Sequence, residues 1–383
     1  MTTNDRNRHG DGCSQKMRRV TLVGDREGWA LASLGERISS RLASEAAITS
    51  TVTSLEKLYT NPWRELLALR QAEVVHWLDP YCYKIGRGLV EAAQVVTIHH
   101  IEIGATIDAD TYSNVSVLAP PGQTLDMLTS LGFVDVTPTP YVVDLERFRP
   151  RNQAACRATL KLDAEVQLIG FFGKESSNLH DRKGTQLLVA TLQKLGNGSP
   201  PELVLGGEGW SNLITVLRSA GIRVHDFRGA CDALMPILYS CLDVYLCTST
   251  VEGGPLPVLE AMAAGVCVVS TPVGQVGLWM QDGVSGYIRD SWSGVVSALS
   301  VLLADVEFRR TVGVAARHSA ERYSDEAALT STVDVYKRLL GGDGVETTVG
   351  RGAPIAAGQF VGRLLLHHLH RLHNNTESWL RIR

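Results

Sequence analysis

The sequence lacks a strong excess of charge of either sign. Its 383 residues include 37 Lys and Arg against 40 Asp and Glu, which gives a formal net charge of -3 at pH 7. A chain so close to neutral has no general field that would attract a polyanion. Nucleic acid is therefore not an expected partner.

Paired cysteines and long apolar runs are absent as well. The seven cysteines form no C-x-x-C pair and no metal-ligand spacing, and their odd number favours free thiols in a reducing compartment. A transmembrane helix needs about 20 apolar residues, whereas the longest candidate, Met235 to Cys247, is interrupted by Asp243. The polar first 19 residues have no apolar secretory core. Together these absences predict a cytoplasmic protein.

The sequence does contain two series of apolar runs separated by helical-period segments. Val- and Ile-rich runs of this kind favour parallel strands that are covered on both faces, and the length favours two domains. The expected strands lie in RRVTLVGD, AEVVHWLDP, AAQVVTIHH and NVSVLAPP, and then in EVQLIGFFG, ELVLGGEG, IRVHDFRG, DVYLCTST and VCVVSTP. The predicted fold class is α/β, with two doubly wound parallel-sheet domains that face each other.

The predicted domain boundaries follow changes in composition. Prolines interrupt the pattern between Thr137 and Pro150, which indicates the interdomain connection and hinge. The expected organisation is a disordered tail at 1–17, a first domain at 18–145, a second domain at 146–325, a closing helix at 326–341, and a Gly-rich linker with an amphipathic basic tail at 342–383.

The run TSTVEGGPLPVLEAMAAGVCVVSTPVGQ, residues 248–275, is the most informative. Glu252 follows a predicted strand, Gly253 and Gly254 allow close backbone approach, and Pro255 or Pro257 suits the first turn of the next helix. Such a helix start is suited to a diphosphate. Glu260 comes eight positions after Glu252, and carboxylates at this site would suit sugar hydroxyls. The alternative is that both glutamates are ordinary solvated side chains.

This run resembles the retaining glycosyltransferases of family 4, which have the GT-B fold and an E-x7-E motif followed by EAMA.G.PV. The resemblance implies that Glu252 contacts the transferred sugar and that Glu260 holds the ribose of a nucleotide-sugar donor. It also implies donor contacts from the backbone around Gly253, Gly254, Pro255 and Leu256. It covers most of the second domain and only the outline of the first.

Three further segments carry the resemblance. In FFGKESSNLHDRKGTQLLV, residues 171–189, it implies that Gly173 lies beside the donor and that Lys174 and Lys183 neutralise the leaving diphosphate. Position 174 is lysine where the family more often has arginine, and Arg182 could substitute for it. In VVTIHHIE, His99 matches the histidine of the family's T-x-H-D sequence, while His100 replaces the aspartate. The alternatives are two surface lysines and a structural histidine.

The remaining matches are weaker. LGGEGW at 205–210 implies a donor contact at Glu208, and VHDFRGA at 224–230 implies a nucleotide-base edge at Gly229. The interdomain motif N-G-V-D-x-x-x-F-x-P has Tyr141 and Val142 in place of asparagine and glycine, so no side-chain role transfers to Tyr141. Gly24, Gly28 and Trp29 form a strand-to-helix turn that faces either the cleft or the core.

The sequence thus predicts a metal-independent, retaining glycosyltransferase that needs no cofactor besides its nucleotide-sugar co-substrate, with a hydroxyl acceptor of unspecified type. Two rivals stay open, a non-catalytic nucleotide-sugar-binding protein of the same fold and a nucleotide-sugar epimerase. The segment 359–383 suits either peripheral membrane contact or packing on protein. Base, sugar, acceptor and oligomeric state are not specified.

Overall fold

The computed structural model of the chain describes residues 17–341, apart from 26–29, 102–106, 176–180, 197–199, 231 and 325–327. Residues 1–16, Gly28, Trp29 and all residues from 342 onward, for which a tail, a turn and a linker were predicted, lie outside this described part. No helix in the described ranges is long and apolar enough to span a membrane.

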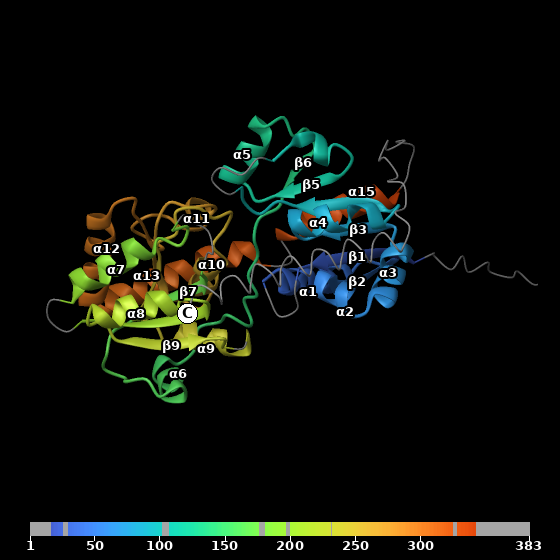
Figure 1. Cartoon of the computed structure of the whole chain (residues 1–383). Helices are drawn as coiled ribbons and strands as arrows, with labels where there is room; N and C mark the ends of the chain where they lie inside the picture. The colour runs from blue at the N-terminus through green and yellow to red at the C-terminus, as the bar shows by residue number, and fades with distance from the viewer. Residues whose placement is uncertain are drawn as a thin grey trace, which may run out of the picture.

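The first domain alternates strands and helices around one sheet (Figure 1). Its elements are β1 (Arg18–Gly24), α1 (Ala30–Leu42), β2 (Ile48–Ser54), α2 (Leu55–Thr60), α3 (Pro62–Gln71), β3 (Val74–Trp77), α4 (Pro80–Gly86), η1 (Arg87–Leu89), β4 (Ala93–Thr97), η2 (Ala109–Tyr112), β5 (Ser116–Ala119), α5 (Gln123–Ser130) and β6 (Val136–Pro138).

The second domain repeats this alternation. Its elements are α6 (Gln153–Leu160), β7 (Leu168–Lys174), α7 (Thr185–Leu195), β8 (Glu202–Glu208), α8 (Ser211–Ser219), β9 (Val224–Arg228), η3 (Asp232–Leu234), α9 (Met235–Ser240), β10 (Val244–Cys247), α10 (Leu256–Ala263), β11 (Cys267–Ser270), α11 (Val276–Trp279), β12 (Tyr287–Ile288), α12 (Trp292–Ala304), α13 (Val306–Ala320) and η4 (Glu321–Tyr323), and α15 (Thr330–Gly341) follows.

Within the described residues the strands form two parallel six-stranded sheets, in the orders β2-β1-β3-β4-β5-β6 and β12-β11-β10-β7-β8-β9. The central strands β3, β10 and β11 are buried along their whole length, as expected for strands covered on both faces. In the second domain, α7, α8 and α12 pack on one face and α6, α9 and α10 on the other, while α13 contributes side chains to both clusters. The predicted doubly wound α/β class is confirmed.

Three strands escaped the sequence-based prediction. β2 has the polar sequence ITSTVTS and is mostly half-buried, because it lies at the edge of its sheet. β6 spans only Val136–Pro138, within the segment that was assigned to the linker, and β12 has two residues. Edge strands with one exposed side and few residues lack the continuous apolar run on which the prediction depended.

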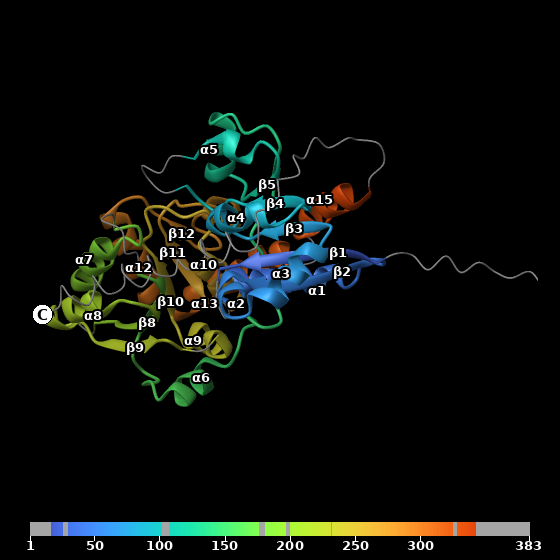
Figure 2. The same cartoon turned by 45° about the vertical axis from the view of Figure 1, so that its right-hand side comes forward.

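After the second domain, α15 returns the chain to the first domain. In Figures 1 and 2, α15 lies beside the first sheet, although α13 and η4, which precede it, belong to the second domain. Leu329, Val333 and Tyr336 pack with Val20 and Val74 of the first sheet, on the same face as α1. The helix expected at 326–341 therefore completes the layer over that face.

Candidate functional site

The centre of the candidate site lies where the second sheet reverses its strand order. β8 and β9 lie on one side of β7, and β10, β11 and β12 lie on the other. The loops after β7 and β10 therefore leave neighbouring strands in opposite directions, and open α/β sheets bind ligands at the carboxyl ends of such strands. Lys183 comes from the first of these loops and Glu252 from the second.

Glu252 is buried, with 9% of its surface exposed, and it lies between two cations. Its Oε1 accepts a hydrogen bond from Lys183 Nζ at 2.5 Å, and its Oε2 accepts one from Arg182 Nη1 at 3.0 Å. Ser249 Oγ donates a third bond to Oε1 at 3.1 Å. Burial raises the pKa of Glu252, but Lys183 and Arg182 lower it, and the net shift is downward. Glu252 is therefore a fixed negative charge.

Backbone contacts join the two loops that carry these charges. Thr248 Oγ1 donates to the Lys183 carbonyl at 2.8 Å, and Thr250 N donates to the Arg182 carbonyl at 2.8 Å. Gly184 has φ +64°, and a Cβ there would overlap the Thr248 carbonyl. This position therefore needs glycine both for its backbone angle and for the close approach of the loops.

Glu260 lies in the second turn of α10 and has a different environment. Its Oε2 accepts a hydrogen bond from Tyr239 Oη at 2.6 Å. Burial raises the pKa of Glu260, against the lowering effects of the Tyr239 hydrogen bond and of Arg147. The two glutamates thus differ in character, because Glu252 is paired with cations while Glu260 bonds a neutral phenol.

The helix start between the two glutamates differs from the expectation in one respect. α10 begins at Leu256 after Pro255, with Pro257 in its first turn, which confirms the predicted proline positions. Prolines have no N–H, and Val258 N donates to the Pro255 carbonyl at 2.8 Å. The first turn therefore offers fewer free N–H groups than predicted for a diphosphate.

The other predicted donor residues lie along the same edge of the sheet. Lys174 ends β7 and is paired in register with Glu208, which ends β8, and both are exposed. A Cβ on Gly173 would lie 3.4 Å from Lys183 Nζ, which places this glycine beside the cationic loop. Gly229 follows β9 and bonds the Gly207 carbonyl at 2.9 Å. These residues share an edge, but β7 and β8 separate β9 from β10, the strand that precedes Glu252.

His99 follows β4 of the first domain and uses both ring nitrogens within the protein. Nε2 contacts the Leu78 carbonyl at 2.8 Å, and Nδ1 contacts Tyr141 Oη at 2.9 Å. A carbonyl can only accept, so Nε2 carries the proton. Burial lowers the pKa of His99, which favours the neutral ring, and Nδ1 then accepts a hydrogen bond from Tyr141.

The two domains meet at the glycines next to Glu252. A Cβ on Gly253 would overlap the His99 carbonyl oxygen, and one on Gly254 would overlap the ring of Tyr141. In this structure the groups that approach these glycines closely belong to His99 and Tyr141 of the same chain.

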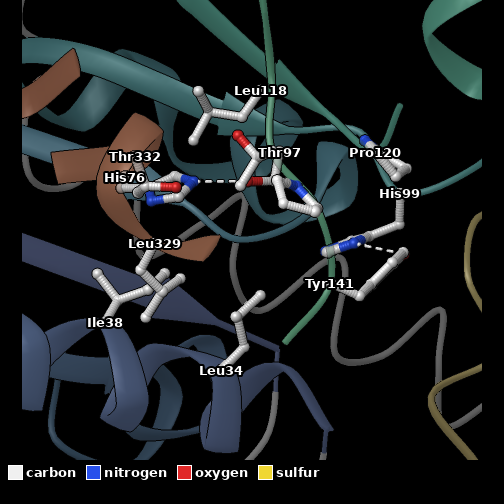
Figure 3. A pocket seen from close by; sticks show the side chains of 12 residues that line it. Leu34, Ile38, His76, Thr97, His99, Leu118, Pro120, Tyr141, Leu329 and Thr332 are labelled. Atoms are coloured by element: carbon white, nitrogen blue, oxygen red, sulfur yellow. Dashed lines mark hydrogen bonds between the residues drawn. The ribbon is translucent and has the colours of Figure 1, made fainter. Parts of the chain in front are cut away.

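A small cavity of about 20 Å³ lies behind the His99 and Tyr141 pair (Figure 3). Its lining comes from α1, β3, β4, β5, the linker and α15, and includes His76, Thr97 and Thr332. His76 is fully buried, and burial lowers its pKa to about 3. This space holds about one water molecule, so it is far smaller than a sugar or nucleotide.

Sequence reasoning missed several residues of this arrangement. Ser249 and Tyr239 contact the two glutamates, yet neither differs in sequence from an ordinary loop serine or core tyrosine. Tyr141 and Gln275 join the linker to the second domain, where Tyr141 N donates to Gln275 Oε1 at 3.4 Å. Tyr141 had been set aside because it departs from the family pattern. Among the described residues no group of three or more His, Cys, Asp or Glu could hold a metal ion.

Comparison with known proteins finds similar sequences over part of the chain. Residues 167–305 match the family model described as glycosyl transferases group 1. The D-inositol 3-phosphate glycosyltransferase of Segniliparus rotundus is 31% identical over 220 residues, which is 55% of this chain and 48% of that protein. The enzyme of the same name from Saccharomonospora viridis is 28% identical over 219 residues, with 52% and 49% covered. The chain spans about half the length of these curated relatives.

Solved structures show the same fold at low sequence identity. Sucrose-phosphate synthase from Thermosynechococcus elongatus superposes with a TM-score of 0.68 at 15% identity, covering 85% of this chain and 99% of that one. Anabaena HepE in complex with UDP and glucose superposes with a TM-score of 0.67 at 14% identity, covering 85% and 100%. Residues 167–305 therefore form a glycosyl transferases group 1 domain, within a chain that has the GT-B fold.

Proposed function

We propose that the protein is a retaining glycosyltransferase that moves a sugar from a nucleoside diphosphate donor to a hydroxyl acceptor without a metal ion. The observation that carries this proposal is that Glu252 is buried beside Arg182 and Lys183. Glu252 lies within the residues that match the group 1 family, in the loop that leads into the helix of Glu260. The names of the relatives and the UDP-glucose bound to Anabaena HepE support a nucleotide-sugar donor.

The site offers the donor two kinds of contact, carboxylates for its hydroxyl groups and cations for its diphosphate. Glu252 is ionised and accepts hydrogen bonds, which suits the hydroxyls of the transferred sugar. Glu260, which takes one bond from Tyr239, has lone pairs left for the hydroxyls of a ribose. Arg182 and Lys183 are the cations that lie nearest to Glu252, and they would stabilise the negative charge of a diphosphate.

The reaction that we infer is a substitution on one face of the sugar. The acceptor oxygen bonds to the anomeric carbon while the bond from that carbon to the diphosphate oxygen breaks. The electron pair leaves with the nucleoside diphosphate, and the acceptor proton passes to the departing phosphate oxygen. His99 is not assigned as the base, because both of its ring nitrogens already have partners. The protein contributes orientation and charge stabilisation.

The acceptor is the least defined part of the proposal. Donor and acceptor would be brought together between the two domains, where His99 and the Glu252 loop are in contact. The relatives' name refers to an inositol phosphate, but they align with only about half of their length, so we extend only the chemical class, a hydroxyl acceptor. A thermal-shift screen of nucleoside diphosphates and their sugars would identify the donor.

The test is transfer by wild-type protein and by Glu252→Ala, using the donor found in this screen and a panel of hydroxyl acceptors. We expect the variant to keep its fold and to lose about 100-fold or more in turnover, because it removes both a sugar contact and the partner of two cations. Wild-type turnover in the variant would refute the assignment of Glu252. An inverted anomeric configuration by NMR would refute retention, and activity abolished by EDTA and restored by Mg²⁺ would refute metal independence.

The rival reading as a non-catalytic binder is tested by the same material. A transferase slowly hydrolyses its donor and releases nucleoside diphosphate, whereas a protein that only binds the donor does not. An epimerase would isomerise the sugar without any acceptor. Donor binding without hydrolysis, or isomerisation of the sugar without an acceptor, would each refute the proposed function.

A further inference from the structure

Tyr141 lies in the interdomain segment and contacts both domains. Its hydroxyl bonds His99 Nδ1 at 2.9 Å, and its ring stacks on the His99 ring with centroids 5.6 Å apart and an interplanar angle of 26°. On the other side its ring lies at a steep angle to the ring of Trp279, with centroids 6.4 Å apart. Its backbone N–H donates a hydrogen bond to Gln275. One side chain thus connects the first domain to α11 of the second.

The loop that carries Glu252 is shaped to receive this side chain. A Cβ on Gly254 would overlap the Tyr141 ring, so the ring occupies the space that any larger residue at 254 would need. At Gly253 a Cβ would overlap the backbone carbonyl of His99 and would also lie 3.1 Å from the Tyr141 hydroxyl. Neither glycine has a positive φ, so alanine is excluded at these positions by packing and not by backbone conformation.

The hydrogen bonds of His99 determine which group donates in its contact with Tyr141. Nε2 must donate to the Leu78 carbonyl, so a neutral ring has only Nδ1 left to accept the Tyr141 hydroxyl proton. The Leu78 carbonyl thus sets the tautomer of His99, and Tyr141 holds the orientation of its ring. The carbonyl of His99, which touches Gly253, also accepts a bond from Thr124 Oγ1 at 3.2 Å. A shift of the His99 ring would be transmitted to the Glu252 loop.

We propose that Tyr141 is a positioning residue that sets the register between His99 and the Glu252 loop by seating its ring over Gly254 and bonding His99 Nδ1. The inference rests on the proposed function. It concerns a position at which this chain departs from the family motif, tyrosine in place of asparagine. Tyr141 is not proposed to touch the reacting atoms. It acts through His99 and through the two glycines beside Glu252.

The experiment combines a double-mutant cycle with kinetics. Gly254→Ala should lower Tm by roughly 3 to 10 °C in the wild-type background, because the new methyl overlaps the ring. In a Tyr141→Ala background the same change should cost less than about half of this shift, since the ring is gone and residues in contact do not add. Gly86→Ala is the matched control, because the atoms nearest to its new methyl all belong to the ring of Trp77, and it should cost the same in both backgrounds.

The kinetic arm separates positioning from bulk stability. With UDP-glucose, or the donor of highest wild-type turnover, Tyr141→Ala should lower kcat/KM by about 10- to 100-fold at a temperature where it is fully folded. Tyr141→Phe keeps the ring and should lose only about 2- to 10-fold, the worth of one hydrogen bond. In Tyr141→Phe the ¹⁵N shift of His99 Nδ1 should move, which a purely structural role of the ring would not cause.

Two outcomes would overturn the inference while leaving the proposed function intact. The first is additive Tm changes for Gly254→Ala and Tyr141→Ala. The second is unchanged kcat/KM in both Tyr141 variants of an active enzyme. Failure of the proposed function looks different, since the wild-type protein would then release no nucleoside diphosphate from any donor, whatever residue stands at 141.

Discussion

At the scale of single residues, Glu252 is paired with Arg182 and Lys183, so one substitution at 252 changes the net charge of the site. Glu252→Gln keeps the volume of the side chain but removes the negative charge beside two cations. We expect turnover to fall sharply, because the proposed contact between Glu252 and the sugar weakens. Affinity for free UDP should rise by roughly threefold to tenfold, because the cations no longer share a carboxylate. Isothermal titration calorimetry measures this.

The matched control for this prediction is Glu307→Gln, which removes the same charge from an exposed pair with Arg310 on α13. It should leave UDP affinity unchanged, because an exposed charge is screened by solvent and salt. Equal or weaker UDP binding by Glu252→Gln would show that Arg182 and Lys183 do not hold the diphosphate.

Thr332 offers a second residue-scale prediction, unrelated to catalysis. It is fully buried on α15 at the small cavity, and its Oγ1 has no hydrogen-bond partner among the described residues. Thr332→Val has nearly the same shape and removes a buried hydroxyl for which the described residues offer no partner. The free energy of unfolding should rise by about 1 kcal/mol. Thr332→Ser, which keeps the hydroxyl and loses the methyl, should be less stable than wild type in the same urea titration. A destabilised Thr332→Val would contradict the prediction.

At the scale of elements, Asp243 joins three parts of the second domain just before β10. It is buried, and its carboxylate accepts bonds from Arg157 of α6 at 2.7 Å and from Arg309 of α13 at 2.9 Å. The N–H of Leu168, at the start of β7, donates to it at 2.7 Å. This carboxylate therefore fixes two helices against the strand from which the Glu252 loop emerges.

Asp243→Asn should destabilise the protein by about 3 to 5 kcal/mol, because two buried guanidinium groups lose their counter-charge. Chemical denaturation measures the loss, and the exposed pair in Glu307→Gln should change stability by less than about 1 kcal/mol. A similar small effect for Asp243→Asn would show that Arg157 and Arg309 are held by their backbone acceptors, which include the carbonyls of Cys241 and Leu302.

Elements also show how far the sequence alone could go. Fully buried strands such as β3, β10 and β11 were predictable, since each is a short continuous apolar run. The polar edge strand β2 was not, because its stability comes from pairing with β1 along seven residues and not from its own hydrophobicity. Residue propensity and hydrophobic pattern identify buried strands, but they identify edge strands poorly.

The candidate site was predictable for a different reason. Glu252, Glu260, Lys183 and the glycines were found from spacing and resemblance, and the structure places Lys183 on Glu252 although 69 residues separate them. The resemblance could not supply Tyr141, because this chain has its own residue there. Contacts such as Tyr239 to Glu260 depend on which helices pack together, and a single sequence carries little record of that.

At the scale of the whole molecule, the chain passes from the first domain to the second through the segment after β6, and it returns through α15. Arg18, at the start of β1, donates to the carbonyl of Leu340 near the end of α15. His76 of β3 bonds Tyr336 of α15 at 2.5 Å and Thr97 of β4 at 2.7 Å. α15 is thus held against the first sheet, so within the described residues the two domains are joined at two places.

This fastening should make stability depend on pH. Burial lowers the pKa of His76 to about 3 in the folded protein, against about 6.5 when the chain is unfolded. Between these values the unfolded state binds a proton that the folded state does not, so stability falls as pH decreases below about 6.5. The stabilising contribution is present above 6.5 and is lost at about 1.4 kcal/mol per pH unit. Burial lowers the pKa of His99 as well, which adds to the same trend.

The measurement is urea denaturation between pH 7.5 and 4.5 for the wild type and for His76→Gln, which cannot take up this proton. The variant will be less stable throughout, since glutamine does not reproduce both ring contacts, so the informative quantity is the slope with pH. We expect wild type to lose about 2 to 3 kcal/mol more than the variant over this range. Glu260 and the other titrating groups are common to both proteins and cancel in the difference. Parallel pH profiles would show that the proton uptake of His76 is not coupled to unfolding, and hence that the contact between β3 and α15 opens before the domain does.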